Sequence, residues 1–290
     1  MTLTYRVSNN NLINLKELLK SHFQISDRLL AKLKNAQKIF INGEKVSVRA
    51  SLKTGDLVEV NLDFLENNSN IVPTKMELDI LFEDETMLII NKPAGVPVHP
   101  SMDHFEDSLS NGVRFYFDEI DLKRKIRPVN RLDKDTSGIV IFAKNEYVQE
   151  YLVRQMKANK FVKEYIAVCS GSFDFKVATI DAPIARKEDS IIERCVSEAG
   201  DKAVTHYEVL KNVNNYSVVK CILETGRTHQ IRVHLAHIGH PLLGDTLYGT
   251  SSPLIHRQAL HAYKVKFIHP ISQKPIALTA KIPNDIENII

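Results

Sequence analysis

The chain has 290 residues, of which 43% are hydrophobic and 25% charged, as in an ordinary globular protein with room for one large domain and a small one. Its net charge is +3, and residues 1–70 hold the whole excess with 10 basic and 7 acidic side chains, an imbalance that suits contact with a polyanion. No apolar run approaches the ~20 residues of a membrane span. The first residues also lack the layout of a signal peptide, so we expect a cytoplasmic protein with no membrane partner.

The beginning of the chain has the pattern of two helices and a small sheet. Leucines at helical spacing, among them Leu12, predict a first helix over residues 11–21. Ser26 is the predicted N-cap of a second helix over residues 27–38. Asn42-Gly43 between two apolar runs predicts a β-hairpin, which residues 52–62 follow with a closing strand.

This segment resembles the S4 RNA-binding domain, in which a helix pair and the loop before an Asn-Gly-Glu turn present basic side chains to structured RNA. The resemblance implies an S4-like RNA-binding domain over residues 1–62, joined to the rest by a polar, Asn-rich linker over residues 63–75. The basic side chains that it implies for RNA contact are Arg28, Lys32, Lys34 and Lys38. The alternative is that these four cations form an ordinary solvated helix face.

The remainder of the chain mixes strand-like and helix-like segments without strict alternation, which predicts an α+β domain over residues 76–290. Runs rich in β-branched and aromatic residues predict strands at residues 78–84, 87–93, 138–145, 164–171, 203–210 and 216–225. Helical patterns occupy residues 105–117, 146–159 and 229–239. The three cysteines, Cys169, Cys195 and Cys221, are an odd number without a CxxC pair, so we expect reduced, buried thiols.

Two carboxylates stand close together in VNRLDKDTSG, residues 129–138. Haloacid-dehalogenase-type phosphatases use Asp-x-Asp-x-Thr with magnesium, and Asp133-Lys134-Asp135-Thr136-Ser137 nearly fits. In those phosphatases the motif follows a buried apolar strand, whereas here the apolar run GIVIFAKN comes after it. A magnesium-dependent phosphatase is therefore only a third hypothesis.

A second resemblance covers residues 78–285. The segment NRLDKDTSG is similar to the His-Arg-Leu-Asp-x-x-Thr-Ser-Gly motif of the RluA-type RNA pseudouridine synthases. Other motifs of that family are matched in order and spacing by LIINKPAGVPVHPS, KEYIAVCSG, LETGRTHQIRVHLAHIGHPLLGDTLYG and the closing LHAYKVKFIHP. An S4-like domain in front is a common arrangement in the family. One departure is Asn130, which stands where histidine is most often found.

The resemblance implies an α+β pseudouridine synthase fold, with a large mixed, mainly antiparallel β-sheet flanked by helices and loops. It implies an isomerase that converts uridine to pseudouridine in RNA, and the S4-like segment favours large-subunit ribosomal RNA over transfer RNA. The reaction breaks the N1–C1′ bond, turns the uracil and rejoins it through C5, so we expect no metal, no cofactor and a monomer without an obligate protein partner. The hypothesis from another class is an RNA-binding relative that has lost catalysis, which the Asn130 departure mildly favours.

The same resemblance assigns the site residues. Asp133 is the implied catalytic carboxylate, acting at C1′ as a nucleophile or at C2′ as a base, and Arg232 is its implied partner. Tyr165 stacks on the target base, and Arg131 fills the space that the flipped nucleotide leaves, whereas Asp135 is structural. Further implied substrate contacts come from Arg227, Thr228, His229, Leu243 and Lys92, the last as part of the pocket floor.

Histidines recur at His234, His237 and His240, a spacing that superficially resembles a zinc site. On a helix the third of them has rotated away from the first, Gly239 is expected to end that helix, and no HExxH motif accompanies them. We therefore expect these side chains to pack or to contact RNA rather than to bind a metal.

Overall fold

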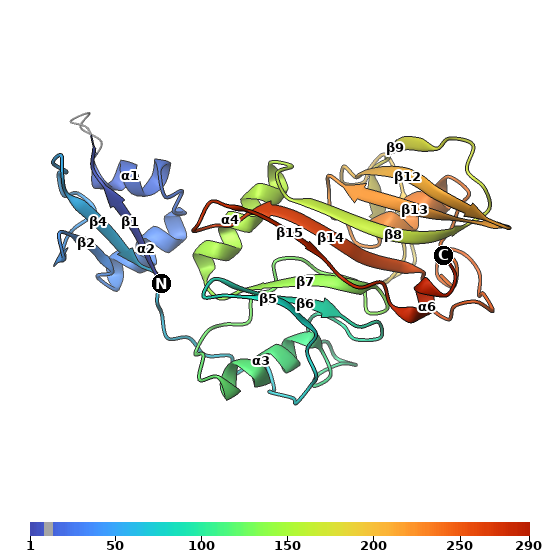
Figure 1. Cartoon of the computed structure of the whole chain (residues 1–290), viewed down its shortest axis with the longest axis horizontal. Helices are drawn as coiled ribbons and strands as arrows, with labels where there is room; N and C mark the ends of the chain where they lie inside the picture. The colour runs from blue at the N-terminus through green and yellow to red at the C-terminus, as the bar shows by residue number, and fades with distance from the viewer. Residues whose placement is uncertain (9–13) are drawn as a thin grey trace.

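The computed structural model describes residues 1–8 and 14–290. A four-stranded sheet with two helices, formed by the N-terminal segment (residues 1–62), lies beside a nine-stranded sheet that extends through the rest of the chain (Figure 1). Residues 63–75 connect them without a helix or strand. Within the described residues, no helix combines the length and apolar character that crossing a membrane requires.

The N-terminal segment confirms the predicted helix pair and hairpin. Its elements are β1 (Thr2–Arg6), α1 (Leu15–Ser21), α2 (Asp27–Asn35), β2 (Ile39–Ile41), β3 (Glu44–Lys45) and β4 (Leu57–Asn61), with the strand order β1-β4-β2-β3. The Ser26 side chain caps α2 by accepting a hydrogen bond from the Leu29 amide, and Asn42-Gly43 turns the hairpin with φ angles of 52° and 83°. Residues 11–13 of the predicted first helix, including Leu12, lie outside the described residues. Strand β1 was not predicted.

The large sheet has the order β5-β6-β7-β14-β8-β13-β12-β9, with β15 paired to β14. Its strands are β5 (Ile80–Glu83), β6 (Met87–Lys92), β7 (Ser137–Ala143), β8 (Val162–Ser170), β9 (Val177–Asp181), β12 (Val204–Val213), β13 (Tyr216–Leu223), β14 (Leu260–Ile268) and β15 (Pro275–Thr279). Each pairing is antiparallel except that of β7 with β14, which is parallel. The prediction of an α+β fold with a mixed, mainly antiparallel sheet is confirmed.

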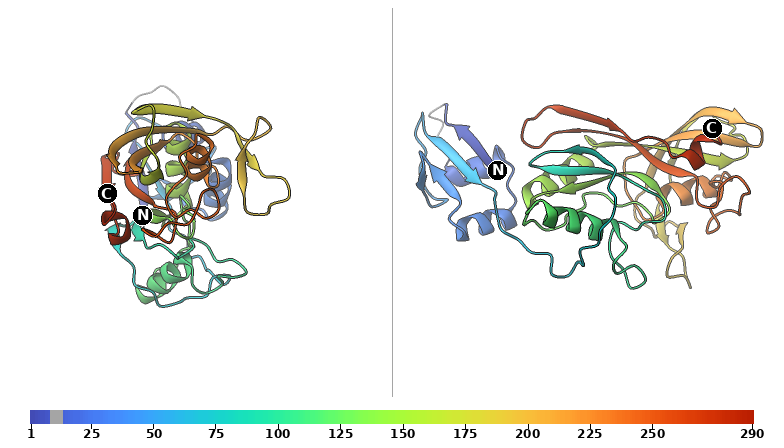
Figure 2. Two further views of the ribbon diagram at one scale, coloured as in Figure 1. Left: turned by 90° about the vertical axis from the view of Figure 1, so that its right-hand side faces the viewer. Right: turned by 60° about the horizontal axis from the view of Figure 1, so that its bottom comes forward.

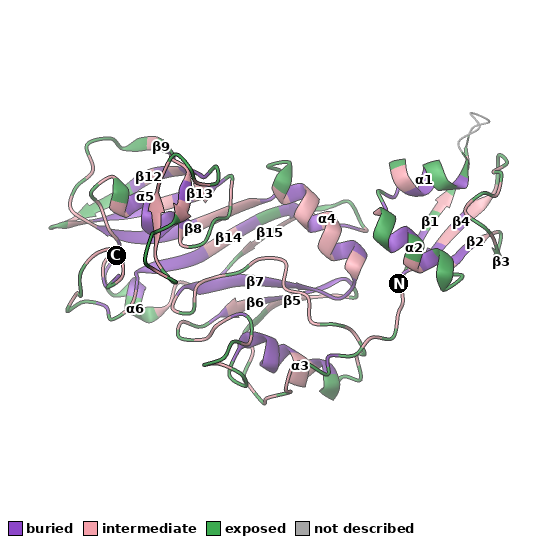
Figure 3. Ribbon diagram, turned by 180° about the vertical axis from the view of Figure 1, so that it is seen from behind, coloured by how far each residue is buried: buried purple, intermediate pink, exposed green. Residues whose placement is uncertain are grey.

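Helices α3 (Leu109–Glu119) and α4 (Glu146–Lys157) cover opposite faces of β6 and β7. Val140 and Phe142 of β7 join a core with α3, while Ile139 and Ile141 join a core with α4. Every residue of β7 is therefore buried, as its continuous apolar run indicates (Figure 3). The remaining helices are α5 (Gln230–His237), packed against β8 and β13, and the short α6 (Asn284–Glu287).

A glycine at the start of β7 allows close packing against β14. Gly138 has a φ of +113°, and a Cβ atom there would lie 2.3 Å from the Ala262 carbonyl oxygen, so only glycine allows β7 and β14 to approach. At the far side of the sheet, strands β10 (Ile184–Arg186) and β11 (Arg194–Val196) form a hairpin that projects from the body (Figure 2). Neither this hairpin nor β9 was predicted.

The N-terminal segment docks on the rest of the chain through ion pairs made by α2. Arg28 lies 3.1 Å from Glu146, Lys32 lies 3.0 Å from Glu66, and Ser26 donates a hydrogen bond to Glu150. Glu66 also binds Arg127 through both of its oxygens, at 2.6 and 2.8 Å. Burial alone would raise the pKa of Glu66, but the hydrogen bonds and charges of Arg127 and Lys32 outweigh it and lower the pKa to about 2.

Replacing Glu66 with glutamine is expected to destabilise the protein by about 2 kcal/mol at pH 7. The folded-state pKa lies below the ordinary value of 4.5, so this stabilisation is complete above about pH 5 and is lost as the pH falls toward 2. Urea unfolding at pH 7, 5 and 3 measures the difference between Glu66→Gln and the wild type. The exposed control Glu119→Gln should show no such trend, and a pH-independent difference for Glu66→Gln would contradict the assignment.

Candidate active site

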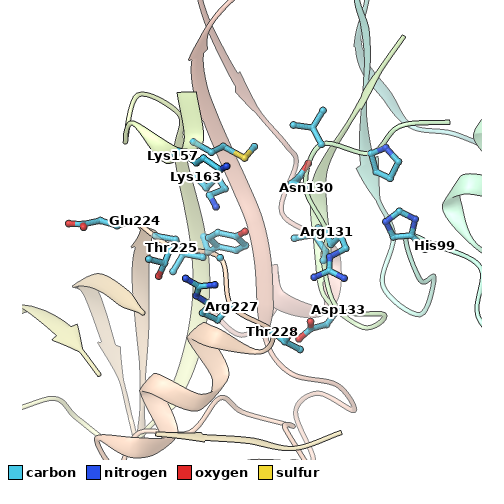
Figure 4. Close-up of a pocket in the computed structure, with 17 residues that line it drawn as sticks. His99, Asn130, Arg131, Asp133, Lys157, Lys163, Glu224, Thr225, Arg227 and Thr228 are labelled. Carbon is cyan, nitrogen blue, oxygen red and sulfur yellow. The ribbon is translucent and has the colours of Figure 1, made fainter. Parts of the chain in front are cut away.

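A pocket of about 750 Å³ opens between the loop before β7, strand β8 and the loop that joins β13 to α5 (Figure 4). This volume is in the range of small-molecule and nucleotide sites. Of the residues predicted from the sequence, the pocket brings together Asp133, Tyr165, Arg131, Arg227 and Thr228. The other lining residues are His99, Pro128, Val129, Asn130, Leu132, Met156, Lys157, Lys163, Leu223, Glu224, Thr225 and Gly226.

Asp133 is held by Arg232 of α5, which in turn is held by Asp245. Arg232 donates from Nη1 to Asp133 at 3.0 Å, and from Nε and Nη2 to the two oxygens of Asp245 at 2.7 and 2.9 Å. The Asp245 side chain is fully buried, and it also accepts hydrogen bonds from the backbone amides of Leu247 and Tyr248. The bidentate pair with Asp245 therefore fixes the guanidinium so that one edge faces Asp133.

Arg232 lies between two carboxylates, Asp133 and Asp245. Burial would lower its pKa, but the hydrogen bonds and charge of Asp245, together with the charge of Asp133, raise the pKa of Arg232 above its usual value. The guanidinium also lies 5.0 Å from the centre of the Tyr248 ring. The site thus holds one permanent cation between two carboxylates.

His229 lies at the start of α5 in a left-handed conformation with φ of 58°. Its Nδ1 is 2.8 Å from the Tyr248 hydroxyl, and its Nε2 is 3.8 Å from Asp133. Burial lowers the pKa of His229 despite the opposing charge of Asp133. The imidazole is therefore neutral near pH 7 and lies next to the Asp133 carboxylate without adding a charge.

Tyr165 forms part of the pocket wall from the middle of β8. Its side chain is almost completely buried, and burial together with the charge of Asp133 raises the pKa of Tyr165. The phenol therefore keeps its proton at neutral pH. Because the ring of Tyr165 is uncharged, a flat aromatic ligand can stack against it.

The Asn130 amide anchors the loop that carries Asp133. It donates to the Ile139 carbonyl and accepts from the Ile141 amide, both at 2.9 Å. Lys92 supports the same loop from below, because its fully buried ammonium donates to the carbonyls of Pro93, Val96 and Lys134 at 2.7–2.8 Å. Burial lowers the pKa of Lys92 to about 7. Both side chains hold the loop in place.

Several residues predicted to contact RNA lie elsewhere. Leu243 packs with Val168 and Ile255 outside the pocket. In the N-terminal segment, Arg28 and Lys32 face the carboxylates at the docking contact, and Lys38 lies 5.1 Å from the centre of the Phe64 ring. Lys34 is exposed on α2. Arg28 and Lys32 thus belong to the docking contact, whereas Lys34 and Lys38 do not pair with its carboxylates.

The three spaced histidines do not converge. His234 contacts Thr205 and the Ala182 carbonyl, both at 2.9 Å, and His240 stacks on Phe173 with 3.9 Å between ring centres. No group of three or more potential metal-binding side chains gathers within residues 1–8 and 14–290. Packing accounts for the contacts of His234 and His240.

Residues 86–237, which include Asp133, Tyr165 and Arg232, match the family model described as RNA pseudouridylate synthase. The chain is also 42% identical over 274 residues to the uncharacterized RNA pseudouridine synthase YhcT of Bacillus subtilis strain 168, covering 94% of this chain and 90% of that protein. The chain belongs to the RNA pseudouridine synthase family. It is therefore an isomerase that forms pseudouridine in RNA.

Other members of the RNA pseudouridine synthase family share most of the chain. Ribosomal large subunit pseudouridine synthase D of Xanthomonas campestris pv. campestris is 36% identical over 264 residues, which cover 86% of this chain and 79% of that protein. Among solved structures, human RNA pseudouridylate synthase domain containing 4 has a TM-score of 0.59 at 23% identity, covering 72% of this chain and 90% of that one. The likeness to this solved structure shows that the two chains share the pseudouridine synthase fold.

The two residues that hold Arg232 in this pseudouridine synthase site, Asp245 and Tyr248, were not predicted from the sequence. Asp245 and Tyr248 lie in LLGDTLYG, a segment in which only Leu243 was predicted as a substrate contact. A lone aspartate among apolar residues was the available signal, because a carboxylate rarely becomes fully buried without a cation. The pairing with Arg232 appears only when α5 and this segment are brought together.

Proposed function

We propose that the protein converts a uridine of large-subunit ribosomal RNA to pseudouridine, with Asp133 as the catalytic carboxylate. The ion pair between Asp133 and Arg232 inside the pocket carries this proposal. Asp133 shares the pocket lining with one other carboxylate, Glu224, whose side chain is turned toward His206 at 2.7 Å. Only Asp133 of these two combines access to the pocket with a fixed cation.

The geometry fits a reaction on a flipped nucleotide. A uridine within folded RNA must leave its stack to enter the pocket, at a cost of a few kcal/mol. Its base can then lie against Tyr165 while the ribose reaches Asp133, which acts on C1′ as a nucleophile or on C2′ as a base. Arg131 and Arg227 lie exposed at the pocket, where phosphates of the flanking nucleotides can meet them. The walls of the pocket can also keep the detached uracil close to the ribose.

The choice of ribosomal RNA rests on the relatives named as ribosomal large subunit pseudouridine synthases. Pseudouridine mapping by carbodiimide treatment and reverse-transcription stops, in total RNA from a deletion strain and its parent, tests this choice. Loss of one or a few stops in large-subunit RNA is the expected result. Loss confined to transfer RNA would refute the choice of substrate, and no loss would favour a relative that binds RNA without modifying it.

We further propose that residues 1–62 form an S4-like RNA-binding domain and that residues 76–290 form the catalytic domain. Because Lys34 is free of the docking contact, Lys34→Ala is expected to weaken RNA binding and to lower the slope of log affinity against log salt by about one. Fluorescence anisotropy with labelled ribosomal RNA fragments at several salt concentrations measures both quantities. The exposed control Lys281→Ala should leave the slope unchanged, and an unchanged slope for Lys34→Ala would exclude this contact.

A further inference from the structure

Lys163 faces the active-site pocket without a partner. It precedes Tyr165 by two residues in β8, and because side chains alternate along a strand, both face the same cavity. The Lys163 ammonium points into the pocket in Figure 4. Its Nζ atom lies 3.6 Å from the position that a Cβ atom would take on Gly226. Among residues 1–8 and 14–290, no hydrogen bond or ion pair reaches this ammonium.

Two other lysines with shielded ammonium groups have partners. Lys92 donates to three backbone carbonyls, and Lys144 binds the Glu83 carboxylate at 2.7 Å and the Asp84 carbonyl at 2.6 Å. Burial lowers the pKa of Lys163, because its charge loses water and gains no counter-charge. An unpaired, shielded cation is costly for a fold. Its position in a pocket therefore indicates an acceptor on the ligand.

Asp133, Tyr165 and Lys163 occupy different positions along the wall of the pocket. All three line the pocket, and Tyr165 and Lys163 both come from β8. Asp133 and Lys163 lie on opposite sides of the pocket in Figure 4. Residues two apart on a strand are separated by about 7 Å, roughly the width of a pyrimidine with its oxygens. A nucleotide with its ribose at Asp133 thus directs its base toward Lys163.

The acceptor is more readily a base oxygen than a phosphate. Phosphates are bonded to the ribose, so they stay at the Asp133 end, where Arg131 is exposed. The uracil edge opposite N1 is the part of the nucleotide that extends past Tyr165. Uracil carries two carbonyl oxygens, and an ammonium is a donor without acceptor capacity. A carbonyl oxygen of the base is therefore the matching group.

We propose that Lys163 donates a hydrogen bond to a carbonyl oxygen of the flipped uracil and stabilises the negative charge that the ring gains when its glycosidic bond breaks. This inference rests on the proposed function. The electron pair of the N1–C1′ bond leaves with the uracil, whose charge spreads over N1 and both carbonyl oxygens, while Asp133 bonds C1′ or removes a proton from C2′. When C5 bonds to C1′, the bond between C1′ and Asp133 breaks, or, on the other route, Asp133 returns its proton to C2′. C5 then loses its proton and N1 gains one, so the ring is neutral and Asp133 is again a free carboxylate. Lys163 keeps its proton throughout and acts through its charge.

The test compares wild type, Lys163→Met, Lys163→Arg and the control Lys266→Met. Lys266 lies on the neighbouring strand β14 and pairs with Glu164 at 2.9 Å outside the pocket. The RNA is a stem-loop with the mapped target uridine, made also with 4-thiouridine or 2-thiouridine at that position. Lys163→Met is expected to lower the single-turnover rate by ~10²-fold, as loss of one charge-stabilising donor does, and Lys163→Arg to recover part of it. Lys266→Met should match the wild type.

The thio-substrates identify the oxygen. Sulfur accepts hydrogen bonds poorly, so one thio substitution should affect wild type and Lys163→Met differently, by at least ~fivefold in the ratio of rates. Equal effects of both substitutions in the two proteins would overturn the base contact. A Lys163→Met variant with an unchanged rate and a raised dissociation constant would assign Lys163 to a phosphate instead and overturn the proposal. If the wild type forms no pseudouridine in this RNA, the proposed substrate is wrong, which is a separate failure.

Discussion

Replacing Asp133 with asparagine is expected to lower pseudouridine formation by at least ~10⁴-fold, the scale seen when an enzyme loses the group that attacks its substrate. Asparagine keeps the size of the side chain and one oxygen for Arg232, but it can neither bond C1′ as a carboxylate nor take a proton from C2′. The folded structure should persist, because Arg232 keeps its two contacts with Asp245. Tritium release from C5-labelled uridine in RNA measures the rate.

The matched control for this variant is Asp135→Asn, two residues along the same loop. Asp135 is absent from the pocket lining, and its backbone carbonyl, rather than its side chain, accepts a hydrogen bond from Arg257. We expect this control to stay within about tenfold of the wild-type rate. Wild-type activity in Asp133→Asn, or an equal loss in both variants, would show that the wrong carboxylate has been assigned.

Replacing Asp245 with asparagine is expected to reduce the single-turnover rate by ~10²-fold while RNA affinity changes little. Asp245 does not line the pocket, so its effect passes through Arg232, which loses one of two charged acceptors and is free to rotate away from Asp133. A buried guanidinium without its counter-charge also costs the folded state about 3 kcal/mol. Rate and affinity are measured at a temperature where urea melts show the variant to be folded.

Asp285→Asn provides the comparison, because Asp285 binds Arg257 with the same two-oxygen geometry, at 2.7 and 2.9 Å, but is 44% exposed. Its loss should cost no more than about 1 kcal/mol. If Asp245→Asn keeps the wild-type rate once folded, Arg232 needs no second carboxylate to act. If instead it loses RNA affinity and rate together, Asp245 supports the RNA surface rather than the chemistry.

The local patterns of the sequence predict much of the fold. The apolar run before AKN becomes β7, buried on both faces, and Asn42-Gly43 forms the hairpin turn. Family motifs also bring Asp133, Tyr165 and Arg232 to one place, with Tyr165 in the pocket wall and Arg232 on Asp133. These features depend on neighbours in the chain or on motifs that retain their spacing.

Contacts between distant segments could not be predicted in this way. The basic stripe of α2 has the same pattern whether it faces RNA or a carboxylate, and the structure places Arg28 and Lys32 against Glu146 and Glu66. The burial of Asp245 against Arg232 and the position of Lys163 in the pocket likewise depend on which segments fold together. The residue type limits which groups a side chain can bind, and the tertiary structure determines which of those groups lies next to it.

The parallel pairing of β7 with β14 has a consequence for the time at which the protein becomes an enzyme. Strand β14, from residues 260–268, separates β7 from β8 in the sheet, although both precede it in the chain. A chain leaving the ribosome has therefore synthesised Asp133, Tyr165 and Arg232 before the strand that fixes the spacing of the pocket walls exists. Pairings between such distant segments form slowly. Catalytic competence thus arrives late in synthesis, when β14 enters the middle of the sheet.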